Sequence, residues 1–158
     1  MAHHEYPGPI VVGVDGSSES VAALKWAVDH AACVGARVRA VTAFTAPPSR
    51  TGSALGYVEE FEVAEAIAAT HAGEAIGRAQ ISGPIERVVA AGPPEDVIIR
   101  HAGDASMIVL GTRDTTRWHA RLRGSLTNRL SGRAPCPVVS VSPDHTLITD
   151  LNEDTASV

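Results

Sequence analysis

The chain has 158 residues, a length typical of a single domain. Hydrophobic residues make up 44% of it but aromatic residues only 4%, so we expect a core built mainly of Val, Ile, Leu and Ala. The formal net charge of -5 at pH 7 argues against a general nucleic-acid binder, because such domains carry a basic surface.

The first elements alternate between buried strands and helices. The apolar run from Ile10 to Val14 is β-branched, apolar on both faces and ended by Asp-Gly, which is typical of a buried parallel strand. Residues 17–35 predict a helix with Ser17 or Ser18 as its N-cap and Gly35 at its end. Its expected inward stripe is Val21, Leu24, Val28 and Ala31. Residues 36–44 predict the second strand.

The rest of the chain continues this alternation. Residues 45–56 contain two prolines and two glycines and predict a loop, which is either a flexible cover over a site or a plain connector. The further predicted strands are residues 85–92, 105–111 and 134–142, and the further predicted helices are residues 57–79, 93–103 and 124–133. The helix at 57–79 is expected to pack through Phe61, Ala64, Ala68, Ala72 and Ile76. The class is therefore α/β, with an open five-stranded parallel sheet and helices on both faces.

One domain at residues 9–142 is expected, with a flexible N-terminus at 1–8 and a polar tail at 143–158 that is disordered or loosely attached. Cys33 and Cys136 are interpreted as buried apolar thiols rather than a redox or metal pair. No apolar stretch approaches the length of a membrane span, and residues 1–9 lack the features of a signal peptide. We therefore predict a cytoplasmic protein with no membrane partner.

The loop after the first strand points to a ligand site. In open parallel sheets, ligands bind beyond the carboxyl ends of the strands, where the winding reverses. Asp15 and Gly16 stand there in place of a glycine-rich dinucleotide fingerprint. A carboxylate at this place repels phosphate and accepts hydrogen bonds from a ribose hydroxyl or an amino group. The alternative is that Asp15 only forms the turn and caps the helix.

The loop after the fourth strand has the opposite charge. Six arginines lie between Gly111 and Arg133, and Asp114 is the only acid there, which indicates an anionic partner. Gly124 and Ser125 open a helix, and free amides at a helix N-terminus favour phosphate, although Ser125 is also explained as an N-cap. The residues alone thus predict a nucleotide, with its phosphates at Gly124 and its sugar and base toward Asp15.

The chain resembles the universal stress protein family over residues 9–142, through "IVVGVDGSSESVAALKWA", "GPPEDVIIRHA", "ASMIVLG" and "APCPVVSV" in this order. The resemblance implies a single Rossmann-like domain of the adenine nucleotide alpha hydrolase type, with strand order 3-2-1-4-5. The nucleotide-binding branch carries G-x2-G-x9-G-[ST], which Gly111, Asp114, Gly124 and Ser125 match in spacing, with Asp114 in place of the second glycine.

The resemblance also implies the roles of individual residues. Asp15 would contact the adenosine part, the backbone of Ala43 would lie near the base, and Gly111 near the ribose; Gly124, Ser125 and Thr127 would hold phosphates. The expected nucleotide site comprises Asp15, Gly16, Ala43, Gly111, Arg113, Asp114, Gly124, Ser125, Leu126 and Thr127. The ligand is ATP, with Mg on its phosphates, or AMP or a cyclic nucleotide. The charge of Asp114 near a triphosphate costs about 1 to 4 kcal/mol, unless Arg113 or Arg117 neutralises it. The alternatives are that Asp114 turns outward or helps to hold a metal ion on the phosphates.

Two functions remain open. In the first, the protein is a stress-response or signalling module whose bound adenine nucleotide alters contacts with an unknown protein partner. In the second, it is a homodimeric scaffold with weakened ATP binding, paired through the last strand at Pro137 to Val141, because an edge strand carries unpaired backbone groups. We do not predict an enzyme, since no P-loop is present and His119 is the sole candidate base in the loop. A nucleic-acid partner is not expected either.

Overall fold

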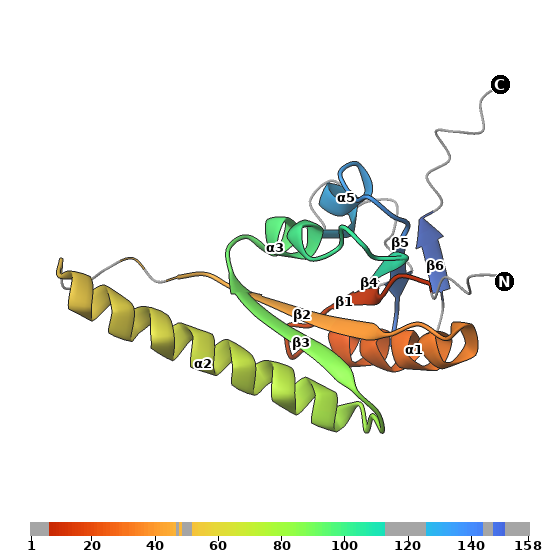
Figure 1. Ribbon diagram of the computed structural model, residues 1–158, viewed down its shortest axis with the longest axis horizontal. Coiled ribbons are helices and arrows are strands. Elements are labelled where there is room, and N and C mark those ends of the chain that lie inside the picture. The colour runs from red at the N-terminus through yellow and green to blue at the C-terminus, as the bar shows by residue number, and fades with distance from the viewer. Residues whose placement is uncertain (1–6, 47, 49–51, 113–125, 144–146, 151–158) are drawn as a thin grey trace, which may run out of the picture.

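The computed structural model describes residues 7–46, 48, 52–112, 126–143 and 147–150. It shows a sheet between two layers of helices, as Figure 1 makes visible. One face is covered by α1 (Ser18–Val34) and α2 (Ala54–Arg78), and the other by α3 (Pro94–Arg100) and α5 (Leu126–Ser131). This arrangement confirms the predicted α/β class with helices on both faces.

The strands that lie between the layers are β1 (Ile10–Gly13), β2 (Val38–Phe44), β3 (Ile85–Ala91), β4 (Met107–Gly111) and β5 (Val138–Val141). They are parallel and lie in the order β3-β2-β1-β4-β5, as expected. Since β1 pairs with both β2 and β4, the winding reverses at β1. The loops that follow β1 and β4 therefore start side by side at one edge of the sheet, where this topology places ligands.

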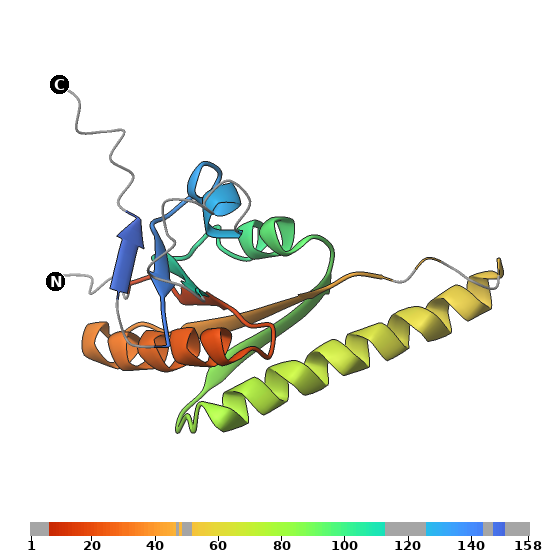
Figure 2. The same ribbon diagram turned by 180° about the vertical axis from the view of Figure 1, so that it is seen from behind.

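A sixth strand was not predicted. β6 (Leu147–Asp150) pairs antiparallel with β5 at the edge of the sheet (Figure 2), although residues 143–158 were expected to be disordered or loosely attached. The physical reason is that the outer edge of β5 presents unpaired N–H and C=O groups, which a nearby extended segment satisfies. The expected homodimer contact through Pro137 to Val141 uses the same edge, so β6 would have to move for it to form.

The core has two parts, one on each face of the sheet. Ile10 and Val12 pack in the cluster under α1 and α2, whereas Val11 packs in the cluster under α3 and α5. All three side chains are fully buried. Because a strand sends alternate side chains to opposite faces, a strand buried on both faces must be apolar throughout, which is the pattern that the sequence showed.

The ends of α1 lie where the sequence placed them. Ser17 is the N-cap and its hydroxyl accepts a hydrogen bond of 3.2 Å from the Ser20 amide. Gly35 ends the helix in the left-handed region with φ of 73°. Of the expected inward stripe, Val21, Leu24 and Ala31 are buried, and Val28 is partly buried.

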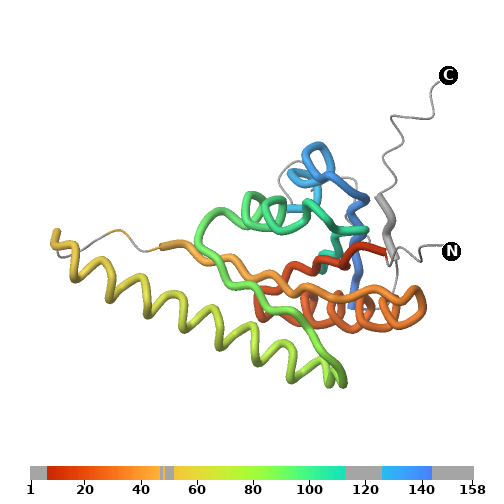
Figure 3. Tube along the Cα trace, in the orientation of Figure 1, coloured from red at the N-terminus to blue at the C-terminus, as the bar shows by residue number. Residues whose placement is uncertain are grey.

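α2 begins earlier than predicted, at Ala54 inside the expected loop, with Ser53 as its N-cap. Its first turns lie beyond the end of the sheet (Figure 3), and Leu55 there is 72% exposed. Of the expected stripe, Ala68, Ala72 and Ile76 are buried. Phe61 and Ala64 are only half-buried, because they lie nearer the end of α2 that extends beyond the sheet. Among the described residues, neither α2 nor any shorter helix is apolar and long enough to cross a membrane.

The two cysteines lie in different environments. Cys33 is exposed near the end of α1, so its interpretation as a buried thiol was wrong. Cys33 lies outside the inward stripe of α1, on the side of the helix that faces solvent. Cys136 is half-buried beside the core under α3 and α5, and burial raises the pKa of its thiol.

Candidate functional site

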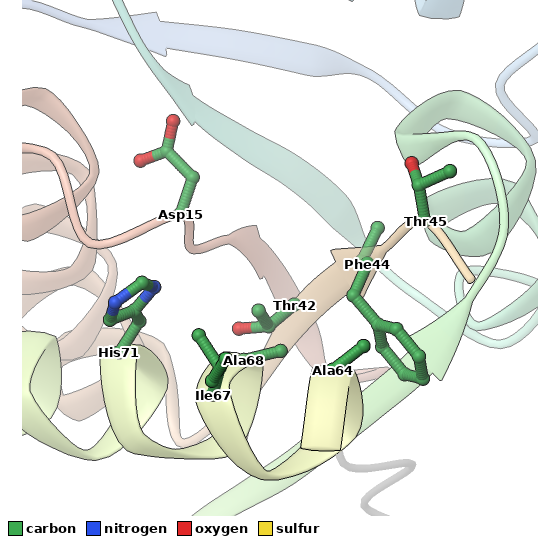
Figure 4. Close-up of a pocket in the computed structure, with 9 residues that line it drawn as sticks. Asp15, Thr42, Phe44, Thr45, Ala64, Ile67, Ala68 and His71 are labelled. Carbon is green, nitrogen blue, oxygen red and sulfur yellow. The ribbon is translucent and has the colours of Figure 1, made fainter. Parts of the chain in front are cut away.

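A pocket opens at the carboxyl ends of β1 and β2, against α2 (Figure 4). Its volume is about 290 Å³, near the lower end of the range for small-molecule sites. The wall on the α2 side is mostly apolar, and the wall on the strand side carries a carboxylate and two hydroxyls. The lining residues are Asp15, Thr42, Ala43, Phe44, Thr45, Ala64, Ile67, Ala68 and His71.

Asp15 is exposed at the pocket mouth and is oriented by the start of α1. Its carboxylate accepts hydrogen bonds from the amide of Ser17, at 3.0 Å, and from the Ser17 hydroxyl. Partial burial raises the pKa of the Asp15 carboxyl, but hydrogen bonds from Ser17 and Ser20 outweigh it and hold the pKa below its ordinary value. Asp15 is therefore an anion at neutral pH and can accept further hydrogen bonds from a ligand.

This shift has a consequence for the pH dependence of stability. Because the pKa of Asp15 is lower in the folded chain, its contribution to stability is present above the unfolded-state pKa of about 3.9 and is lost as the pH falls through the folded-state pKa. We expect the free energies of unfolding of the wild type and of Asp15→Asn to differ by a constant amount from about pH 8 to about pH 5, and to converge below about pH 4. Urea denaturation followed by circular dichroism over this range measures the difference. Convergence near pH 6 would contradict it.

Gly16 joins the β1–α1 loop to α2. It adopts φ of 84°, a conformation that residues with a side chain rarely adopt. Its carbonyl accepts a hydrogen bond of 2.8 Å from the Arg78 guanidinium. A Cβ at Gly16 would lie 3.5 Å from the Cβ of His71. The predicted residue Gly16 thus lets the Asp15 loop approach α2 and form one side of the pocket.

Thr42 is the most deeply buried polar group of the pocket wall. It is 4% exposed, and among the described residues its hydroxyl has no hydrogen-bond partner. An unsatisfied buried hydroxyl costs about 1 to 3 kcal/mol of stability. Buried polar groups are nearly always paired, so the Thr42 hydroxyl has a free hydrogen-bonding capacity in the wall of this pocket.

The predicted site residues separate into groups. Asp15 and Ala43 both line the pocket, and their contact with a nucleotide stays a prediction. Gly111 does not line it; a Cβ at this position would lie 2.3 Å from the backbone C and O of Glu19. Glycine is therefore required here by the packing of β4 against the first turn of α1. The role of Gly111 near a ribose stays a prediction.

The residues expected at the phosphates are described only in part. The Thr127 hydroxyl is buried and lies 3.2 Å from the hydroxyl of Ser140. Leu126 packs against the core under α3 and α5. Both side chains thus hold α5 on the sheet; a phosphate contact from Thr127 and a nucleotide contact from Leu126 stay predictions. The other four, Arg113, Asp114, Gly124 and Ser125, lie outside the described residues.

Two of the six clustered arginines have partners within the chain. Arg129 lies 3.6 Å from the Glu95 carboxylate, and Arg133 lies 2.9 Å from the Asp96 carboxylate. Both acids belong to the first turn of α3. For these two arginines the anion is a side chain of α3, so they help to join α5 and the residues after it to α3. The other four, Arg113, Arg117, Arg121 and Arg123, lie outside the described residues.

The sequence prediction missed the contribution of α2 and of Thr42. Ile67 and His71 are one helical turn apart and line the pocket, but they lie beside the apolar stripe, so nothing in the sequence tied them to Asp15. Thr42 could have been found. It follows Val38 and Ala40 at a spacing of two, so it had to face the same apolar layer.

Comparisons with known proteins agree with this architecture. The model of the universal stress protein family matches residues 8–142. The universal stress protein Rv2624c of Mycobacterium tuberculosis is 30% identical over 132 residues, which are 82% of this chain and 46% of that protein. The chain thus spans about half the length of the curated relatives it matches.

Solved structures of the family share the fold. The universal stress protein UspA from Lactobacillus plantarum is 28% identical, with a TM-score of 0.64, over 85% of this chain and 97% of that one. A universal stress protein from Archaeoglobus fulgidus, solved in complex with dAMP, is 25% identical, with a TM-score of 0.51, over 85% of this chain and 98% of that one. With its reversal of winding at β1, its order of strands and its family match over nearly the whole domain, this chain belongs to the universal stress protein family.

Proposed function

We propose that this chain binds an adenine nucleotide, with the nucleoside end in the pocket between β1, β2 and α2. The observation that carries the proposal is that Asp15 and Ala43, which the family resemblance assigns to the adenosine part, line one pocket. The dAMP complex of the Archaeoglobus fulgidus relative supports an adenine nucleotide as the ligand class.

The chemistry of the pocket suits a nucleoside better than a phosphate. Ala64, Ile67 and Ala68 offer apolar surface to a flat ring, and the Asp15 carboxylate accepts hydrogen bonds from sugar hydroxyls. The charge of Asp15 repels phosphate oxygens. Because β4 is the neighbour of β1, the phosphates would extend toward the loop that follows Gly111.

The biological role that we propose is a stress-response module in which the nucleotide alters contacts with a partner protein. Binding rather than turnover of the ligand is its main activity, and its location is the cytoplasm. The alternative is a homodimeric scaffold with weakened ATP binding, which Asp114 favours. The pairing of β6 with β5 makes that dimer harder to form through β5.

Calorimetric titration of nucleotide-stripped protein tests the proposal. We expect a saturable isotherm with one site per chain for AMP and for Mg-ATP, and tighter binding of AMP, because Asp114 repels a triphosphate more strongly. A cyclic nucleotide is the third ligand to compare. Flat traces for all of these, with the protein shown to be folded by circular dichroism, would overturn the proposal and favour the scaffold.

A further inference from the structure

Thr42 is a polar residue at a position where the fold calls for an apolar one. It lies on β2 on the same face as Val38 and Ala40, which are buried in the core under α1 and α2. The apolar isostere valine would fill the same space without leaving a hydroxyl unpaired. The packing of the unliganded fold therefore does not explain why position 42 is a threonine.

The surroundings of Thr42 supply that reason. Its side chain lies beside the α2 residue Ala68, and Asp15 and His71 lie on the same side of it (Figure 4). All four line the same cavity of about 290 Å³. Thr42 thus lines an open space large enough for a ligand, and its hydroxyl oxygen is buried within the wall of that space.

We propose that the Thr42 hydroxyl forms a hydrogen bond with the polar edge of the nucleobase, which makes Thr42 a base-binding residue of the site. This inference rests on the proposed function. Thr42 adjoins Ala43 in the chain, and both line the pocket deeper than Asp15, which is exposed. A hydroxyl both donates and accepts, so it can pair with either a ring nitrogen or an amino group of the base.

The base is a better partner for Thr42 than the other parts of a nucleotide. Its flat faces match the apolar side chains of Ile67 and Ala68, and its edge carries the polar atoms. A phosphate in contact with Thr42 would lose contact with solvent and lie close to the Asp15 carboxylate. Both effects are unfavourable for the charged phosphate. The sugar is accounted for by Asp15 itself at the pocket mouth.

The Thr42→Val variant gives opposite effects on stability and on binding. We expect the melting temperature of the unliganded protein to rise by about 2 to 4 °C, because the unpaired hydroxyl is gone. We expect the Kd for AMP to rise by about 5- to 10-fold, because the base loses its partner. Differential scanning calorimetry and isothermal titration calorimetry on nucleotide-stripped protein measure the two effects.

Three comparisons locate the contact. Thr42→Ser keeps the hydroxyl and should keep most of the AMP affinity. Thr70→Val makes the same chemical change on the exposed side of α2, where the hydroxyl already donates to the Ala66 carbonyl, and should leave affinity unchanged. Adenosine, which has no phosphate, should lose affinity for Thr42→Val by the same factor as AMP.

The possible failures are distinct. If the wild type binds neither AMP nor adenosine, the proposed function is wrong and this inference falls with it. If the wild type binds but Thr42→Val binds equally well, only the role of Thr42 is wrong. If the loss occurs for AMP and not for adenosine, the hydroxyl contacts the phosphate and the assignment to the base is overturned.

Discussion

Replacing Gly111 with alanine is expected to lower the free energy of unfolding by about 2 to 4 kcal/mol. A Cβ at this position would lie 2.3 Å from the backbone carbonyl of Glu19 and 2.8 Å from its Cβ. Both groups belong to the first turn of α1, so relief requires a shift of the helix against β4 rather than a rotation of a side chain. Urea denaturation followed by circular dichroism measures the loss.

A matched glycine in α2 provides the control. A Cβ at Gly77 meets nothing within 4 Å, and the residue lies within the helix. Gly77→Ala should therefore raise the free energy of unfolding by about 0.5 to 1 kcal/mol, because alanine favours the helix. Equal effects of the two substitutions would contradict the close contact between β4 and α1.

Replacing Asp15 with asparagine is expected to raise the Kd for AMP by about 10- to 100-fold. Asparagine keeps one carbonyl oxygen that can accept from Ser17, so the start of α1 is preserved. It loses the charge that strengthens a hydrogen bond from a sugar hydroxyl. Isothermal titration calorimetry at neutral pH, where the low pKa of Asp15 keeps it ionised, measures the effect.

Asp29→Asn separates this local effect from a change in total charge. Asp29 lies on the exposed side of α1 and does not line the pocket, yet its substitution removes the same charge. We expect the AMP affinity of Asp29→Asn to equal that of the wild type. Loss of affinity in both variants to the same degree would show that Asp15 acts only through the net charge of the protein.

Much of the fold was predictable because its signals are local. The double-faced apolar run at Ile10 to Val14 predicted a central strand, and Ser17 and Gly35 bounded α1 through short-range hydrogen bonds and a left-handed turn. The family motifs supplied the order of the strands. The rule that ligands bind where the winding reverses pointed to Asp15, and the family resemblance added Ala43; both residues line one pocket.

The sequence by itself determined the five parallel strands and the caps of α1, because these depend on residues within one or two turns of each other. Only the tertiary structure decided which face of α2 meets the Asp15 loop, why Gly111 must be glycine and what covers the edge of β5. It also paired Arg129 and Arg133 with acids of α3. Each of these depends on segments far apart in the chain, whose contacts are set by packing in space rather than by local pattern.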